Sequence, residues 1–199
     1  MIFKPKRQTL DHDIKIKING HRLQSSKVVK YLGVYINDEL NWKTHINFVC
    51  SKLKRANGAL GKLRHFVSEK ILLSLYYSLF HSHMSYATLI WGQRENIHTR
   101  LILTLQKQAF RIISFSDFQV PYSPLFLRFK TLPFFDFVES INIIFIFNIL
   151  NNKIPSALTD TLKVERCYQH GRGHLCRTKP GLLKLLKVSS VLFGNNSFR

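Results

Sequence analysis

The sequence predicts an α+β fold that is mostly helical, with a short β-hairpin and strand before a helical bundle and a poorly ordered basic tail. Residues 14–18 alternate strictly between Ile and Lys, which is typical of a strand with one buried face. From Trp42 onward, apolar residues instead recur at steps of three and four, which indicates amphipathic helices. Residues 160–199 are basic, contain Gly and Pro, and keep no persistent period.

The N-terminal strands are predicted from turn chemistry. Asn19-Gly20 is the strongest short-range hairpin dipeptide, so residues 14–18 and His21 to Gln24 are expected to pair. A further apolar run, Lys27 to Ile36, is expected to form one more strand, which Asn37-Asp38 would close in a turn.

Five helical segments are expected after these strands. They cover residues 42–66, 68–91, 96–114, 124–129 and 138–151, with Pro121, Pro124 and Pro133 interrupting the chain between the third and the last. The residues predicted to be buried are Ile46, Val49, Cys50, Leu53, Leu60 and Leu63 in the first helix, Leu72, Leu75, Tyr76, Leu79 and Phe80 in the second, and Ile97, Leu101, Leu105, Ala109, Ile112 and Ile113 in the third.

The helix expected at residues 42–66 is strongly basic on its polar side. Arg55 and Lys62 fall opposite the apolar stripe, and no acidic residue occurs between residues 43 and 64. Gly58 and Gly61 should each weaken this helix, and they are expected to mark a bend or a close approach of another backbone. The basic residues that flank Arg55 and Lys62 are Lys43, Lys52 and Lys54.

The charge balance predicts a polyanionic partner. The chain has 199 residues, with 30 Lys and Arg against 11 Asp and Glu, giving a formal net charge of +19. Such an excess favours nucleic acid. The three cysteines do not suggest a disulfide framework, and no apolar leader indicates a signal peptide. The most hydrophobic stretch, residues 134–150, is interrupted by polar residues, which argues against a membrane span. We therefore expect a protein of the nucleus or cytoplasm that is not secreted.

Acidic and histidine residues give weak indications of catalysis. The close carboxylate pair Asp11 and Asp13 lacks a third acid nearby, so a solvated turn is the better interpretation than a two-metal site. His81 and His83 would point about 200° apart on a helix, which favours packing over metal binding.

The C-terminal segment offers a weak zinc hypothesis. Two thiols and two imidazoles within ten residues match the composition of a structural zinc site. Their spacing is unusually tight and lacks a C-x-x-C pair, so a basic glycine-containing loop is the alternative. The four residues are Cys167, His170, His174 and Cys176.

Most aromatic residues fall at helical core spacing, where packing is the stronger interpretation. Tyr31, Tyr35 and Trp42 are exceptions, because they lie beside the turn between the last strand and the basic helix. There they could stack on bases at a nucleic-acid end.

The chain resembles the C-terminal part of the reverse transcriptase of non-LTR (LINE-type, jockey-like) retrotransposons. The resemblance spans most of residues 1–155. It is carried by VKYLGVYI (29–36) with LNWKTHI (40–46), KLRHFV (62–67), LSLYYSLFHSHMSY (73–86), and IWG (90–92) with LQKQAFRII (105–113). Ala87 stands where such proteins often have Gly.

The resemblance implies a palm remnant with the primer-grip strand at residues 1–37, a helical thumb and connection at 38–155, and a basic tail at 156–199. Tyr31, Leu32 and Gly33 would position a primer, Trp42 would lie beside it, and the phosphate contacts would come from Lys43, Lys52, Lys54, Arg55 and Lys62. The RNA template and DNA primer, and the palm and fingers segment of the parent polyprotein, would be its partners.

The family's Ala-Asp-Asp motif does not occur in the chain, and the resemblance is confined to the region C-terminal to that motif. The resemblance therefore implies binding without polymerisation, with no cofactor in this fragment, whereas intact relatives use Mg²⁺. The alternative from another class is a stand-alone, non-catalytic, basic nucleic-acid-binding protein with a zinc-stabilised tail.

Overall fold

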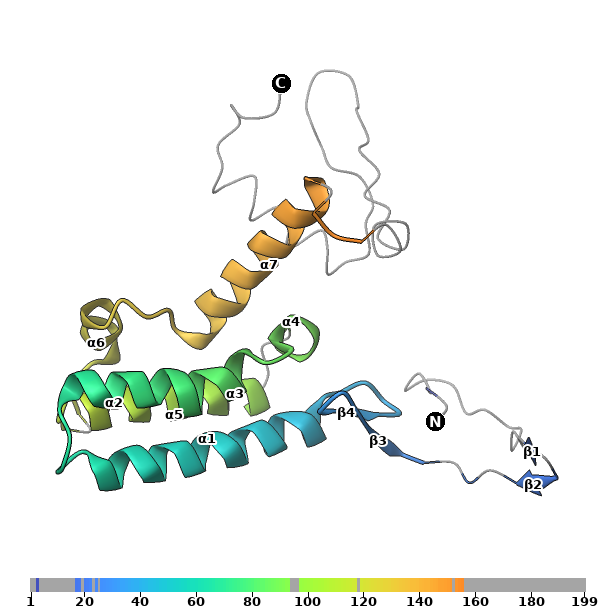
Figure 1. The fold of residues 1–199 in the computed structure, drawn as a ribbon, viewed down its shortest axis with the longest axis horizontal. Helices are drawn as coiled ribbons and strands as arrows, with labels where there is room; N and C mark the ends of the chain where they lie inside the picture. Colours follow the sequence, from blue (N-terminus) through green and yellow to red (C-terminus); the bar gives the residue numbers. More distant parts are fainter. Residues whose placement is uncertain are drawn as a thin grey trace, which may run out of the picture. The chain divides into compact units, whose positions relative to one another are not determined.

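The computed structural model describes residues 3, 17–18, 20–22, 24, 26–93, 97–117, 119–151 and 153–155. The chain divides into two compact units, residues 1–133 and 134–199, and each is described by itself. Figure 1 shows the elements in chain order, and most of the described residues are helical, as the sequence predicts. The domain boundaries expected at residues 37 and 155 stay predictions.

Two short antiparallel hairpins open the first unit. β1 (Lys17–Ile18) pairs with β2 (His21–Arg22) around Gly20, whose φ of 80° suits the predicted turn. β3 (Val28–Tyr31) then pairs with β4 (Val34–Asn37). The prediction of the first hairpin is confirmed for these described residues.

The prediction of one strand over residues 27–36 is wrong, because this run folds back on itself. Tyr31 lies opposite Val34, so Leu32 and Gly33 form a two-residue turn. Both have positive φ, 45° and 81°, which is the backbone geometry that matches the twist of a tight hairpin. Leucine disfavours this conformation, and the unbroken apolar pattern therefore concealed the turn.

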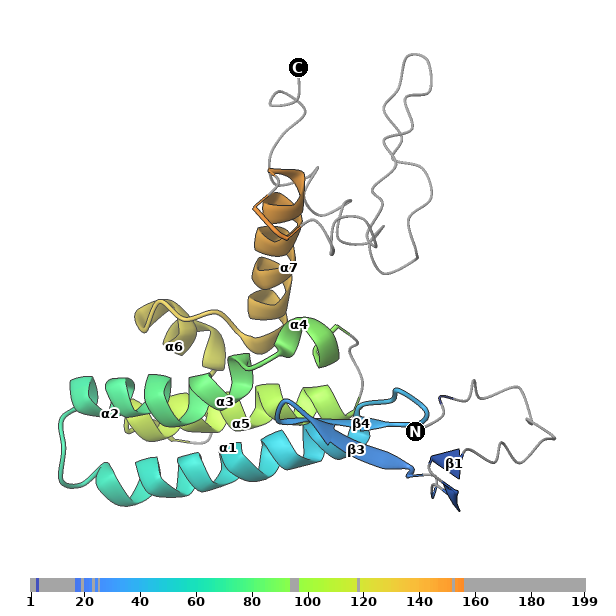
Figure 2. The ribbon, with the colours of Figure 1, turned by 45° about the vertical axis from the view of Figure 1, so that its right-hand side comes forward.

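A helical bundle forms the body of this unit. α1 (Lys43–Leu63) contacts α5 (Ile97–Ile113), while α2 (Glu69–Leu75), a π-helical segment η1 (Tyr76–His81) and α3 (Ser82–Ser85) make one continuous rod against α1 (Figures 1 and 2). Asn57 donates to the Leu105 carbonyl at 2.9 Å, and the Arg64 guanidinium lies over the Phe115 ring at 4.8 Å. The later contact in α1 is made with the later residue of the segment that contains α5, so the two helices run in the same direction.

The core of the bundle contains polar as well as apolar side chains. Gln106 is fully buried, and its Nε2 donates to the Tyr76 hydroxyl and to the Leu132 carbonyl, each at 3.0 Å. Burial raises the pKa of Tyr76, so its phenol stays neutral. The Tyr76 ring packs on Phe80 and Phe110 with centroids 5.1 and 4.7 Å apart. The fully buried apolar side chains of this core include Ile46, Leu53, Leu60, Leu72, Met84, Trp91, Ile102 and Ile113.

The face that α5 buries differs from the predicted one. Ile97 and Leu101 were expected in the core, but they are 73% and 46% exposed. The buried stripe includes Thr99, Ile102 and Gln106, in register with Leu105, Ala109 and Ile113. A pattern built from apolar residues alone misses a stripe that contains two polar side chains.

The two glycines of α1 do not mark a close approach of another backbone. The helix is continuous for 21 residues, and no atom outside its own backbone would lie within 4 Å of a methyl group added at Gly58 or Gly61. The expected close approach is therefore wrong, and both positions have room for alanine.

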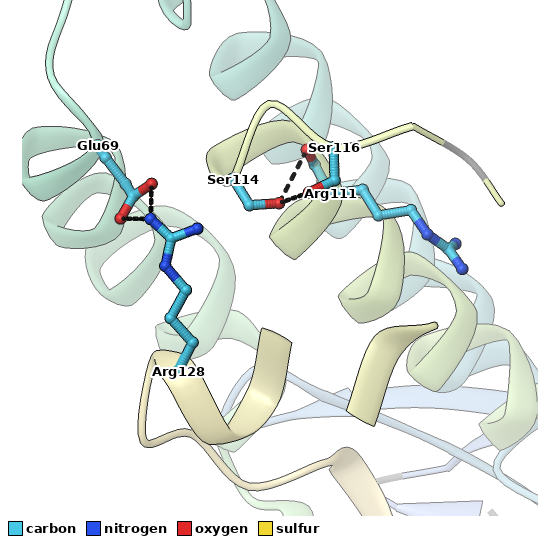
Figure 3. Close-up of polar contacts among 5 residues, drawn as sticks. All are labelled: Glu69, Arg111, Ser114, Ser116 and Arg128. Carbon is cyan, nitrogen blue, oxygen red and sulfur yellow. Dashed lines mark hydrogen bonds and ion pairs between the residues drawn. The ribbon is translucent and has the colours of Figure 1, made fainter. Parts of the chain in front are cut away.

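α6 (Tyr122–Arg128) closes this unit against α5. The Arg128 guanidinium binds the Glu69 carboxylate at 2.7 and 2.8 Å, which ties α6 to the start of α2 (Figure 3). Figure 3 also shows the Ser114 and Ser116 hydroxyls, which share a 2.7 Å hydrogen bond after the last turn of α5. The sequence predicts α6 at residues 124–129, and the helix begins two residues earlier.

The second unit contains α7 (Phe134–Leu150), which begins immediately after Pro133 and one turn before the predicted start. Among the described residues, no helix combines the length and the apolar character needed to cross a bilayer. The expected tail, residues 156–199, and the zinc hypothesis at Cys167, His170, His174 and Cys176 lie outside the described residues.

Candidate nucleic-acid interface

The tip of the β3–β4 hairpin projects apolar and aromatic side chains into solvent. All four residues of β3 are exposed, and at the tip Tyr31 and Leu32 are 63% and 73% exposed. On β4, by contrast, Val34 and Asn37 are buried. The hairpin is therefore anchored through one strand and presents the other, together with its turn.

Tyr86 holds the turn of this hairpin against the bundle. Its hydroxyl donates to the Leu32 carbonyl at 2.6 Å, across 54 positions of sequence. Its ring lies so close to Gly33 that a methyl group on that residue would be 3.5 Å away, at van der Waals contact. The strained left-handed turn thus has one polar and one packing contact with the same side chain.

The backbone after α3 sets the position of Tyr86. Tyr86 is extended and Ala87 has a φ of 53°, which ends α3 and starts α4 (Thr88–Trp91) in a new direction. The indole Nε1 of Trp91 donates to the Tyr86 carbonyl at 2.9 Å, and the Thr88 hydroxyl donates to the Met84 carbonyl. Ala87 adopts the left-handed conformation that glycine prefers.

His45, near the start of α1, links this helix to the hairpin. The Tyr35 backbone N–H donates to His45 Nδ1 at 3.3 Å, and the imidazole lies edge-on to Trp91 with centroids 5.4 Å apart. The side chain is 2% exposed, and burial lowers its pKa. The ring is therefore neutral with its proton on Nε2, which has no hydrogen-bond partner.

The link between β4 and α1 places Trp42. The Asn37 side chain accepts from the Asn41 N–H at 3.1 Å, and the Asn41 side chain accepts from the Lys43 N–H at 3.0 Å. Trp42 has a φ of 60° and is half-buried at the start of the helix. Tyr35 is half-buried too, with its ring packed on Phe48 at 5.1 Å, so Tyr31 is the more accessible of the two tyrosines.

The polar side of α1 carries the predicted phosphate-binding residues. Arg55 and Lys62 are exposed and, seven residues apart, differ by only about 20° around the helix. Lys43 and Lys54 are exposed as well. Lys52 differs from these four, because it is half-buried with its ammonium 5.5 Å from the centre of the Phe48 ring. The exposed set Lys43, Lys54, Arg55 and Lys62 is called the α1 basic face below.

A small depression lies where the hairpin tip, α1 and the end of α3 meet. It encloses about 60 Å³. Its lining combines the turn glycine, aromatic walls and basic side chains without an acidic residue: Gly33, His45, Phe48, Val49, Lys52, His83 and Tyr86. Sequence reasoning selected Gly33 and Lys52 from this set. It gave no functional role to Tyr86, His45 or His83, because contacts across 54 positions leave no periodic signal.

Metal chemistry has no candidate site in the described part of the chain, where no three His, Cys, Asp or Glu residues are grouped to hold an ion. Asp11 and Asp13 lie outside that part. Comparison with models of known protein families, with curated proteins and with solved structures finds no match to this chain.

Proposed function

We propose that this chain binds primer–template nucleic acid, as the primer-grip and thumb part of a non-LTR retrotransposon reverse transcriptase. The observation that carries the proposal is that an exposed hairpin tip and a basic helix follow each other in the chain, with α1 packed against β4. An anchored hairpin tip exposes Tyr31 and Leu32, and the helix that follows it has a basic face with no acidic residue from 43 to 64.

The two surfaces suit different parts of a nucleic acid. The α1 basic face would neutralise backbone phosphates, which positions a duplex without reading its sequence. Tyr31, which is exposed at the tip, offers a ring on which a terminal base can stack. An RNA template paired with a DNA primer presents both features at its growing end.

In this proposal the polymerising chemistry belongs to a separate palm and fingers segment. The sequence contains no Asp-Asp pair to hold two Mg²⁺ ions. We expect no nucleotide incorporation by this chain alone in primer-extension assays with Mg²⁺ or Mn²⁺. Reproducible extension would contradict the assignment of polymerisation to a separate palm and fingers segment.

The binding surface can be tested with two variants of equal charge. Arg55→Gln with Lys62→Gln removes two charges from the α1 basic face, whereas Lys70→Gln with Lys130→Gln removes two exposed charges elsewhere in the same unit. Fluorescence anisotropy with a primer–template should show a loss of about tenfold or more for the first pair and a much smaller loss for the second. Equal losses would mean that net charge, and not this face, drives binding.

A further inference from the structure

The depression beside the hairpin tip differs from the rest of the basic surface. Lys52, His45 and His83 line it, and no acidic residue does. Phe48 and Tyr86 supply aromatic walls on two sides. A concave site with cationic and N–H donor groups and no competing acceptor charge is complementary to an anion.

Lys52 is already partly ordered. It is half-buried, and its ammonium lies 5.5 Å from the centre of the Phe48 ring, one helical turn earlier in α1. Lys54, two residues later, is exposed. A lysine whose stem is held by packing loses less conformational entropy when it binds a ligand. Lys52 should therefore lose less conformational entropy than Lys54 when its ammonium contacts one defined group.

His45, which also lines the depression, has a buried donor without a partner. Its Nδ1 accepts a hydrogen bond from Tyr35, and its Nε2 is buried without a partner although the side chain is 2% exposed. Buried polar atoms of this kind usually have a partner, and a ligand can supply one. A phosphate oxygen in the depression would be an acceptor of the right chemistry.

The rim of the depression is fixed by contacts already present. Gly33 and Tyr86 pack together, and the Tyr86 hydroxyl is occupied by the Leu32 carbonyl. The Tyr86 hydroxyl therefore serves to hold the rim, and the charged contact falls to Lys52.

We propose that this depression holds one phosphate group of a nucleic-acid backbone, with the Lys52 ammonium as its charged ligand. The inference rests on the proposed function and makes it sharper. It selects one phosphate beside the hairpin tip that differs from those contacted by the α1 basic face, because that phosphate is held in a concave and partly buried site.

The test combines protein and nucleic-acid changes. A series of primer–templates each carries one neutral methylphosphonate at a different position, and anisotropy gives the affinity of each. The unaltered chain should lose affinity at each phosphate that α1 contacts, and by about tenfold at the one that the depression holds. Lys52→Ala should lose about tenfold on the unmodified duplex and lose nothing further at that position. Lys54→Ala, the matched control, should stay sensitive there.

Several outcomes separate the inference from the proposed function. If the unaltered chain does not bind primer–template at all, the proposed function fails. If it binds, but Lys52→Ala stays sensitive to the methylphosphonate at every position, the phosphate site is wrong. Lys52→Gln keeps most of the stem over Phe48, so it serves as a second variant if the alanine form unfolds at a lower temperature. Lys52→Arg should restore the sensitivity.

Discussion

The β3–β4 hairpin and the helical bundle of the first unit are built on different principles. In the bundle, α1, α5 and the α2–η1–α3 rod bury large side chains such as Trp91, Phe80 and Phe110 completely. In the hairpin, every residue of β3 is exposed, and the turn uses two positive φ angles. The hairpin is instead held by individual contacts from the bundle, chiefly the Tyr86 bond to Leu32 and the His45 bond to Tyr35.

This difference separates stability from binding. Substitutions in the bundle should change the free energy of unfolding of the whole unit. Substitutions in the hairpin should loosen local structure and weaken nucleic-acid binding with little effect on global unfolding, since regions with few buried contacts open independently.

The largest effect is expected in the bundle core. Gln106→Ala removes two hydrogen bonds, leaves the Tyr76 hydroxyl and the Leu132 carbonyl without this donor, and opens a cavity. We expect the free energy of unfolding to fall by about 3 kcal/mol, measured by urea denaturation. Gln108→Ala, on the half-buried side of the same helix, should cost less than about 1 kcal/mol. Similar losses for both would show that Gln106 does not organise the core.

In the hairpin, Gly33→Ala should act locally. Alanine at a φ of 81° carries backbone strain of about 1–2 kcal/mol, although its methyl group would only touch the Tyr86 ring. Hydrogen exchange should show roughly tenfold less protection for β3 and β4 amides, with α5 amides unchanged. Loss of protection in α5 as well would mean that hairpin and bundle unfold together.

Tyr86→Phe tests the contact between the two regions. It removes the bond to the Leu32 carbonyl but keeps the ring on Gly33, and should cost about 1 kcal/mol, seen as faster exchange in the hairpin. Tyr77→Phe is the matched control, since the Tyr77 hydroxyl bonds to the Thr131 hydroxyl at 3.1 Å, also across 54 positions. The control should leave hairpin exchange and nucleic-acid affinity unchanged. An equal response to both variants would exclude a special role for Tyr86.

Two opposite substitutions should both stabilise the unit slightly. Ala87→Gly relieves a φ of 53°, and Gly58→Ala improves the propensity of an exposed position in α1 that has open space around it. Each should raise the free energy of unfolding by about 0.5–1 kcal/mol in urea denaturation. Destabilisation by Ala87→Gly would contradict the left-handed turn after Tyr86.

The stability of the unit should also depend on pH. Burial lowers the pKa of His45 and of His81 in the folded chain. Below the ordinary histidine pKa, near 6.5, the unfolded chain therefore binds protons that the folded chain does not, and the free energy of unfolding falls as pH decreases. Urea denaturation at pH 7.5, 6.5 and 5.5 should show this decline, by at most about 1.4 kcal/mol per pH unit for each histidine. His45→Gln should flatten the profile, whereas a flat profile in the unaltered chain would contradict the buried neutral ring.

Local patterns predicted most of the helices, because their periodicity and proline boundaries are encoded in short windows. The single helix expected over residues 68–91 is wrong, since it ends at Ser85 and the chain turns at Tyr86 and Ala87 before α4. Local patterns failed where a feature depends on distant partners. The apolar run predicts a continuous strand where Leu32 and Gly33 form a turn, since Leu32 adopts its left-handed conformation with Tyr86 donating to its carbonyl. The buried face of α5 was misplaced, since Gln106 is buried beside Tyr76. Of the candidate site, the α1 basic face was visible in sequence, but the depression was not.

The central claim is that this chain holds primer–template through phosphate contacts of α1 beside the hairpin tip. The most direct measurement is the affinity of the full chain for an RNA–DNA primer–template between 50 and 200 mM salt. We expect log K to fall linearly with log salt at a slope of about −0.9 for each phosphate contact on duplex. Arg55→Gln with Lys62→Gln should make that slope shallower by nearly two. Binding that is absent, or that does not change with salt, would contradict the account.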